Sequence, residues 1–155
     1  MVIRRGGAQD TRFLRDMLHH AYYWKERKPD EGPGPVALYV KAWGRPGDTA
    51  VIAINEGFPI GAAWFRSFSA QQPGYGFVDE NTPELAIAVV PNARGLGAGG
   101  ALLDALLERA RAEGYPAISL SVDKFNEGAM RLYERHGFER VSETDDSVTM
   151  VCRLA

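Results

Sequence analysis

Residues 89–100 read VVPNARGLGAGG and join two segments of different character. The residues before them, Glu84–Val90, are a nearly continuous apolar run ended by Pro91, which is typical of a central strand covered on both faces. The residues after them, Gly97–Glu113, carry apolar side chains at i, i+3, i+4 and i+7, the pattern of an amphipathic helix. This order predicts a buried strand, a glycine-rich loop and a long helix in direct succession.

The glycine-rich loop has the composition of a phosphate-binding site. Four glycines lie within residues 95–100, directly after Arg94. Glycines let the backbone approach a ligand and direct consecutive N–H groups at one point. The first N–H groups of a helix have no partner within the helix, and the helix dipole favours an anion there. One or two glycines would suffice for a simple turn, so we predict that this loop binds a phosphate group.

A dinucleotide-binding site is the first alternative for this loop. Gly95, Gly97 and Gly100 match G-x-G-x-x-G, and Asp123 follows 23 residues after the last of them. However, four residues separate the strand from the first glycine, the motif begins past the midpoint of the chain, and only 32 residues follow Asp123. A P-loop is excluded because no Gly-Lys-Ser/Thr follows.

Periodicity along the rest of the chain predicts the other elements. Strands are expected at Val2–Arg5, Thr49–Asn55, Ile60–Phe68, Glu84–Val90, Ala117–Val122, Phe138–Ser142 and Ser147–Leu154. Helices are expected at Asp10–Trp24, Leu38–Trp43, Gly97–Glu113 and Asn126–His136. Only the segment 84–122 has the strand–helix–strand form that demands a parallel pair. The fold class is therefore α/β (α+β), with a mixed, mostly antiparallel sheet in a single domain of residues 1–155.

Composition narrows the class of protein. The chain has 155 residues, 45% hydrophobic and 25% charged, and a net charge of −2, so no basic field points to nucleic acid. Cys152 is the only cysteine, it lies in an expected strand, and no Cys/His cluster has metal spacing. We expect a packing role for Cys152 and no metal. No apolar run has the length of a signal peptide or a membrane span, so we expect a cytoplasmic protein with no membrane partner.

Two motifs together resemble the GCN5-related N-acetyltransferase (GNAT) superfamily. Residues 94–99 fit the family's loop, Arg or Gln, two residues, Gly, one residue, then Gly or Ala. Residues 126–138, NEGAMRLYERHGF, are similar to the family's N-x-x-A-x-x-L-Y-x-x-x-G-F helix and turn. The resemblance covers roughly residues 84–138, about a third of the chain, in the family's order and spacing.

The resemblance implies that acetyl-coenzyme A is the co-substrate. Its pyrophosphate would be held by the backbone amides of Arg94, Gly95, Leu96, Gly97, Ala98 and Gly99. The edge of the strand 84–89 would pair with the pantetheine arm, and the N–H of Val89 would be offered to the thioester carbonyl. Asn126 would hydrogen-bond the pantetheine, and Tyr133 would sit by the sulfur.

Helix geometry is compatible with the last two roles. Asn126 and Tyr133 are seven residues apart, so they share a helix face and lie about 10 Å apart along the axis. From spacing alone, however, Tyr133 fits an apolar stripe of core residues, and Asn126 is a good N-cap. The resemblance favours the ligand-binding reading of Tyr133, whereas both readings of Asn126 can hold.

The implied chemistry is transfer of an acetyl group to an amine. Tyr133 would stabilise the leaving thiolate by a hydrogen bond, because a phenol with a pKa near 10 is a weaker acid than a thiol near 8.5. Glu84 opens the central strand, where the family often places a carboxylate base that works through water. Asp79, Glu80 and bulk water are rivals for this role.

The sequence alone does not specify the acceptor amine or the oligomeric state. A primary amine of a small molecule or peptide is expected as the acceptor, and a homodimer is left open. Gly74 and Gly76 in the loop Ser69–Thr82 suggest a moving lid. The alternative from another class is a non-catalytic module that binds or senses acetyl-coenzyme A.

Overall fold

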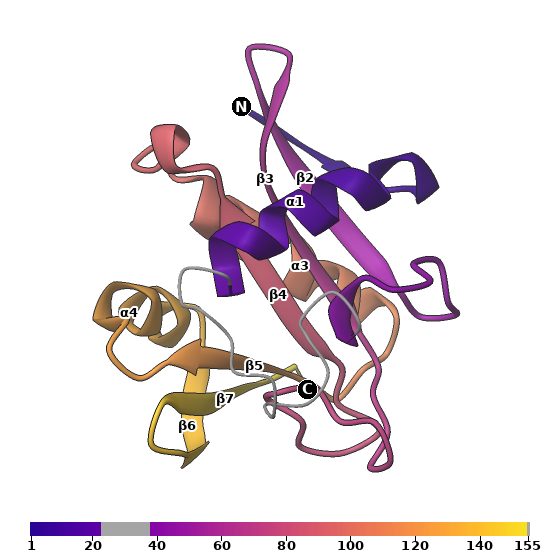
Figure 1. Ribbon diagram of the computed structural model, residues 1–155, viewed down its shortest axis with the longest axis vertical. Helices are drawn as coiled ribbons and strands as arrows, with labels where there is room; N and C mark the ends of the chain where they lie inside the picture. The colour runs from indigo at the N-terminus through magenta and orange to yellow at the C-terminus, as the bar shows by residue number, and fades with distance from the viewer. Residues whose placement is uncertain (23–37, 155) are drawn as a thin grey trace. The chain divides into compact units, whose positions relative to one another are not determined.

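A computed structural model describes residues 1–22 and 38–154 of the chain (Figure 1). Its strands are β1 (Val2–Arg5), β2 (Thr49–Asn55), β3 (Phe58–Arg66), β4 (Glu84–Val89), β5 (Ala117–Asp123), β6 (Phe138–Glu143) and β7 (Ser147–Arg153). Its helices are α1 (Thr11–Tyr22), α3 (Ala98–Ala112) and α4 (Glu127–Arg135).

The strands form one mixed sheet in the order β1-β2-β3-β4-β5-β7-β6. The pairs β1–β2, β2–β3, β5–β7 and β6–β7 are antiparallel, and β4 pairs in parallel with β5 at Glu84 and Ser119. The helix α3 connects these two parallel strands, as a crossover must. The predicted mixed, mostly antiparallel α/β fold is confirmed.

Most element boundaries differ from the predicted ones by two residues or fewer. The β2–β3 hairpin is tighter than expected, because Glu56 and Gly57 both have positive φ, 52° and 83°, and close a two-residue turn. Of the helix expected at 38–43, Leu38 and Tyr39 are helical and the chain turns from Val40. The last part of the first expected helix, after Tyr22, lies outside the described residues.

Internal contacts divide the chain into two compact units, and the expectation of a single domain stays a prediction. The first unit comprises Met1–Arg66 and Ala86–Leu106, and the second comprises Ser67–Leu85 and Leu107–Ala155. In the first unit, α1 packs against β3 (Figure 1). Its buried apolar side chains include Leu14, Leu18, Ile52, Trp64 and Leu102.

In the second unit, α4 packs against β6. Its buried apolar side chains include Leu107, Ile118, Leu120, Met130 and Met150. Burial of one such side chain contributes about 1.5–3 kcal/mol, so each unit has its own hydrophobic core.

Candidate active site

The glycine-rich loop belongs to the first unit and forms a short bridge from β4 to α3. The N–H of Val90 donates to the carbonyl of Ile60 at 2.8 Å, which fixes the end of β4 to β3. A single 3-10 turn, Pro91–Ala93, follows. Gly95 and Gly97 then adopt φ values of +92° and +78°, a region that side chains with a Cβ rarely enter. The loop therefore requires glycine at both positions.

Several consecutive backbone N–H groups at the start of α3 have no hydrogen-bond acceptor among the described residues. The N–H of Ala101 donates to the carbonyl of Gly97 at 3.2 Å, which makes Gly97 the N-cap of the helix. Within residues 1–22 and 38–154, no backbone N–H from Gly95 through Gly100 donates a hydrogen bond to the protein. Arg94 beside them is exposed and forms no ion pair with any described residue. Consecutive free amides at a helix start, next to an arginine, form a surface suited to a phosphate.

Val89, the remaining candidate of the first unit, lies half-buried at the end of β4. A Cβ at Gly61 on β3 would lie 3.1 Å from Cγ2 of Val89 and 3.0 Å from the carbonyl oxygen of Ala88. Glycine at position 61 therefore lets β3 approach β4 closely at the strand end that leads into the loop.

Glu84, Asn126 and Tyr133 belong to the second unit. Asn126 is exposed, and its side-chain oxygen accepts the N–H of Ala129 at 3.2 Å, which confirms the predicted N-cap of α4. This bond uses the side-chain oxygen of Asn126. Its NH₂ group is a hydrogen-bond donor of the kind that could bond to a pantetheine carbonyl. The ring of Tyr133 packs against Phe138 with centroids 5.9 Å apart and an interplanar angle of 60°.

The environment of Tyr133 makes its hydroxyl a poor acid. The residue as a whole keeps some exposure, yet the surrounding protein excludes enough water from the hydroxyl to raise the pKa of Tyr133 to about 12. Full proton transfer to the thiolate of an ordinary thiol would then be uphill by about 5 kcal/mol. The phenol stays protonated at neutral pH and can act as a hydrogen-bond donor.

Glu84 is buried and takes part in the backbone architecture of its unit. Its side chain is 1% exposed, whereas an ordinary glutamate at a strand end would be solvated. Its Oε1 accepts the N–H of Gly76 at 2.9 Å. A carboxylate this deeply buried could reach an acceptor amine only through an intervening water.

Ser119, the parallel register partner of Glu84, was missed in the sequence. Register partners in a parallel pair direct their side chains to the same face of the sheet. The Oγ of Ser119 is buried and has no hydrogen-bond partner among the described residues. Such an orphaned hydroxyl costs about 1–3 kcal/mol unless a bound water satisfies it. The only signal in the sequence is the alternation of Ser119 and Ser121 with apolar residues in the strand.

The loop before β4 is braced by carboxylates. Oδ1 of Asp79 accepts the N–H of Asn81 at 2.8 Å, and Oε2 of Glu80 accepts the N–H of Ala70 at 3.2 Å. Three carboxylates were considered as the base: Asp79, Glu80 and Glu84. Each of them therefore accepts a hydrogen bond from a backbone N–H of this loop. These bonds hold the loop together locally.

Gly74 and Gly76 serve close packing in this loop, a use that the expectation of a moving lid did not foresee. A Cβ at Gly76 would lie 2.7 Å from the carbonyl carbon and oxygen of Leu120. A Cβ at Gly74 would collide with the carboxylate of Glu84. Neither glycine has a positive φ, so close approach rather than backbone freedom explains both.

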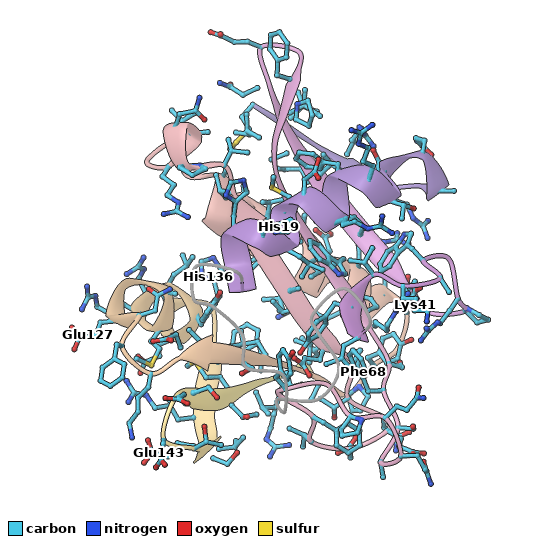
Figure 2. All side chains as sticks on the ribbon, in the orientation of Figure 1. His19, Lys41, Phe68, Glu127, His136 and Glu143 are labelled. Carbon is cyan, nitrogen blue, oxygen red and sulfur yellow. The ribbon has the colours of Figure 1, made fainter. Side chains whose placement is uncertain are left out.

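His136, the last residue of the helix expected at Asn126–His136, and Cys152 have structural roles. Nδ1 of His136 lies 2.8 Å from the carbonyl oxygen of Leu132 at the end of α4, which matches the predicted helix-end residue (Figure 2). Cys152 is buried in β7, and burial raises the pKa of its thiol, so it stays protonated. This agrees with the expected packing role.

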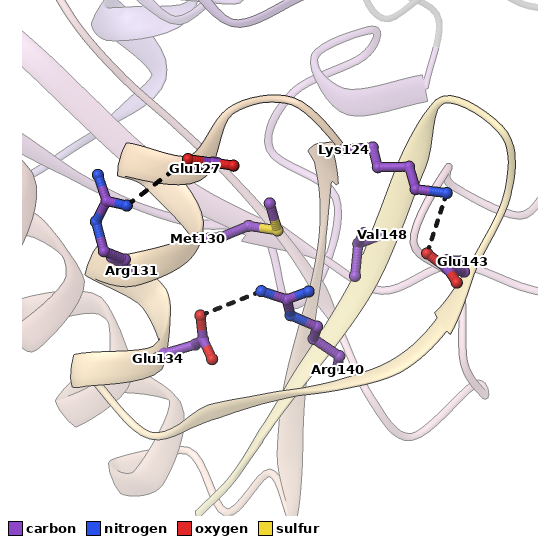
Figure 3. Close-up of a pocket in the computed structure, with 8 residues that line it drawn as sticks. All are labelled: Lys124, Glu127, Met130, Arg131, Glu134, Arg140, Glu143 and Val148. Atoms are coloured by element: carbon purple, nitrogen blue, oxygen red, sulfur yellow. Dashed lines mark ion pairs between the residues drawn. The ribbon is translucent and has the colours of Figure 1, made fainter.

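A hollow of about 420 Å³ lies between α4, β6 and β7 (Figure 3). It is lined by Lys124, Glu127, Met130, Arg131, Glu134, Arg140, Glu143 and Val148. Each of its three cationic side chains is paired with a glutamate: Lys124 with Glu143, Arg131 with Glu127 and Arg140 with Glu134, at 3.3, 3.9 and 3.6 Å. The hollow therefore offers no surplus charge for an ionic ligand.

Comparison with known proteins identifies the family. The sequence model of the acetyltransferase (GNAT) family matches residues 12–138. This chain belongs to that family, and the resemblance noted in the sequence is confirmed.

Solved structures of this family share the fold. The ribosomal-protein-alanine N-acetyltransferase from Brucella melitensis is 24% identical, with a TM-score of 0.75 over 99% of this chain and 100% of that chain. The phosphinothricin acetyltransferase from Sinorhizobium meliloti, solved in complex with AcCoA, is also 24% identical, with a TM-score of 0.75 over 99% of this chain and 88% of that one.

Relatives of known activity match over shorter segments. A mycothiol acetyltransferase from Catenulispora acidiphila is 32% identical over 116 residues, which are 71% of this chain and 35% of that protein. An L-methionine sulfoximine/L-methionine sulfone acetyltransferase from Pseudomonas aeruginosa is 33% identical over 93 residues, 55% of this chain and 53% of that protein. The chain spans about a quarter of the mycothiol acetyltransferase from Brachybacterium faecium.

Two further observations concern the described residues alone. They contain no group of three or more His, Cys, Asp or Glu side chains placed to hold a metal ion. None of their helices combines the length and the apolar character that a membrane crossing requires.

Proposed function

We propose that this chain is an N-acetyltransferase that moves the acetyl group of acetyl-coenzyme A to a primary amine of a small molecule or peptide. The observation that carries the proposal is the run of amides from Gly95 to Gly100 at the start of α3, which donate no hydrogen bond to any described residue, in a chain of the GNAT family. The acetyl-coenzyme A complex of the phosphinothricin acetyltransferase supports the choice of ligand.

In this proposal, the free amides of the glycine-rich loop bind the pyrophosphate. The backbone N–H groups of Gly95, Leu96, Gly97, Ala98 and Gly99 would supply the hydrogen bonds. The backbone N–H of Arg94, which was also expected to contribute, donates to the carbonyl of Pro91 at 3.4 Å, so Arg94 would contribute the permanent positive charge of its guanidinium. The pantetheine arm would lie along β4 as an added strand, which fits an extended chain of amides. The NH₂ group of Asn126 would donate to a pantetheine carbonyl.

The reaction is direct attack of the amine on the thioester. The amine nitrogen bonds to the carbonyl carbon, and the N–H of Val89 is proposed to stabilise the oxyanion of the tetrahedral intermediate. The carbon–sulfur bond then breaks, and the Tyr133 hydroxyl donates a hydrogen bond to the departing thiolate. The amine proton passes through a water to Glu84, and the unpartnered hydroxyl of Ser119 on the same sheet face would bind that water.

The family assignment does not specify which amine is the acceptor. The names of the relatives mention compounds as different as mycothiol and L-methionine sulfoximine or sulfone, and the chain spans only part of the length of these relatives. A homodimer and a cytoplasmic location stay predictions.

Two measurements test the proposal. Acetyl-coenzyme A should raise the melting temperature by mass action, and a panel of amines and peptides should release free thiol from it. A shift with NAD and none with acetyl-coenzyme A would replace the proposal with a dinucleotide site. Tight binding without thiol release from any acceptor would favour the non-catalytic sensing module.

A further inference from the structure

The buried carboxylate of Glu84 does a second task that its proposed role as a proton acceptor does not require. Its Oε1 accepts the backbone N–H of Gly76, eight residues earlier in the chain, at 2.9 Å, and this bond is buried. A buried carboxylate is costly unless hydrogen bonds satisfy it, so this contact is part of what keeps Glu84 in place. In turn, Glu84 holds the segment around Gly76.

Small residues let the segment Gly74–Gly76 approach Glu84 closely. Gly74 and Gly76 are buried, and Tyr75 between them is 39% exposed. A side chain at Gly74 would strike the Glu84 carboxylate, and one at Gly76 would strike the backbone of Leu120. The two glycine positions therefore face the interior of the unit, and the side chain between them is partly exposed.

The same segment continues outward beyond Gly76. The N–H of Phe77 donates to the carbonyl of Gly74 at 3.2 Å, which closes a tight turn. Val78 after this turn is 42% exposed. Two large side chains, Tyr75 and Val78, are thus partly exposed on a segment whose backbone is bonded to Glu84.

The proposed reaction places the acceptor near this segment. A single water between the amine and Glu84 spans two hydrogen bonds, so the amine would lie within about 6 Å of the carboxylate. Gly76 is in direct contact with that carboxylate. In the proposed reaction, the residues around Gly76 therefore lie within reach of the bound acceptor.

We propose that Glu84 is also a positioning residue, which holds Gly74–Val78 as the acceptor-recognition segment with Tyr75 as its principal contact side chain. This inference rests on the proposed function. The rigid aromatic ring of Tyr75 suits an amine that carries an apolar or cationic group, because it offers both apolar area and a π-face. The two roles of Glu84 are separable: positioning needs an oxygen acceptor, whereas proton transfer needs the charge.

Two substitutions separate these roles without any activity assay. Glu84→Gln keeps an oxygen that can accept the Gly76 N–H, and Glu84→Ala removes it. Hydrogen exchange of the Gly76 amide, followed by NMR, should stay within about threefold of wild type in the Gln variant and accelerate at least tenfold in the Ala variant. Glu80→Ala is the control, because Glu80 braces the same loop at Ala70 and should leave the exchange of Gly76 unchanged.

The recognition role is tested by kinetics with an amine found in the thiol-release panel. Tyr75→Ala should raise the KM of the amine about fivefold or more while the KM of acetyl-coenzyme A stays constant. Gly76→Ala should act in the same direction, since its Cβ displaces the segment from β5. Gly128→Ala is the matched control, because a Cβ at Gly128 meets nothing within 4 Å.

Unchanged exchange at Gly76 in Glu84→Ala would overturn the positioning role, and an unchanged amine KM in Tyr75→Ala would overturn the recognition role. Absence of acetyl transfer to every amine would instead remove the proposed function. The exchange measurement would still decide whether Glu84 holds the segment, so the two failures are distinguishable.

Discussion

Arg66 at the end of β3 and Asp48 before β2 form a fully buried, two-point ion pair. Nε of Arg66 lies 3.0 Å from Oδ1 of Asp48, and Nη2 lies 2.8 Å from Oδ2. The side chains are only 1% and 2% exposed. The guanidinium also donates to the carbonyls of Leu38 and Lys41, at 3.1 and 2.9 Å. The pair thus ties the chain before β2 to the end of β3.

Removing one partner of this pair should be strongly destabilising. Asp48→Ala leaves the buried guanidinium without its counter-charge, which costs about 3–5 kcal/mol of the free energy of unfolding. Urea denaturation of the variant measures this loss. Arg131→Ala is the control: Arg131 pairs with Glu127 at 3.9 Å with both side chains mostly exposed, and its loss should cost less than about 1 kcal/mol. Equal losses in the two variants would contradict the prediction.

A second ion pair, between Arg4 and Asp10, should make the free energy of unfolding depend on pH. Arg4 donates to both carboxylate oxygens of Asp10, at 2.9 and 2.8 Å, and this contact holds the pKa of Asp10 below its ordinary value of 3.8. A lowered folded-state pKa gives stability that is present above the unfolded pKa and is lost as pH falls through the folded pKa. Asp10→Asn should therefore cost about 1–2 kcal/mol at pH 7, and the difference from wild type should shrink below about pH 4. A difference that stays constant from pH 7 to pH 3 would show that charge is not involved.

The glycine-rich loop should lose its ligand when a side chain is added. Gly97→Val places a branched side chain at a φ of +78°, so both the loop conformation and the approach of the backbone to a phosphate are disturbed. We expect the melting shift caused by acetyl-coenzyme A to disappear. Gly57→Val is the matched control, because Gly57 has a φ of +83° and similarly open surroundings in the β2–β3 turn. It should lower the melting temperature but keep the ligand-induced shift.

The hydroxyl of Tyr133 should matter for turnover more than for binding. Tyr133→Phe keeps the ring packing against Phe138 and removes only the donor, so kcat should fall roughly tenfold to a thousandfold with little change in acetyl-coenzyme A affinity. Because the pKa of Tyr133 is about 12, the phenol stays protonated up to about pH 11, and the factor lost should be the same from pH 7 to pH 9. An unchanged kcat would assign Tyr133 to packing alone.

Local patterns of the sequence were sufficient for the order of the elements and for the motifs. The glycine density of residues 95–100, the N-cap at Asn126 and the apolar run of β4 each depend on neighbours a few residues away. Backbone conformation and capping are local effects, so these features could be predicted without the fold. The family resemblance depended on the same two local motifs.

The tertiary structure decided which polar side chains are buried and what they contact. In the sequence, Asp48 and Arg66 are indistinguishable from solvated surface charges, nothing shows that Glu84 is buried, and Gly74 and Gly76 look like signs of mobility. Strand register brings Glu84 beside Ser119, and the fold of the loop brings it to Gly76. Burial and pairing between residues far apart in the chain depend on how the strands align, and no local pattern of residues encodes that alignment.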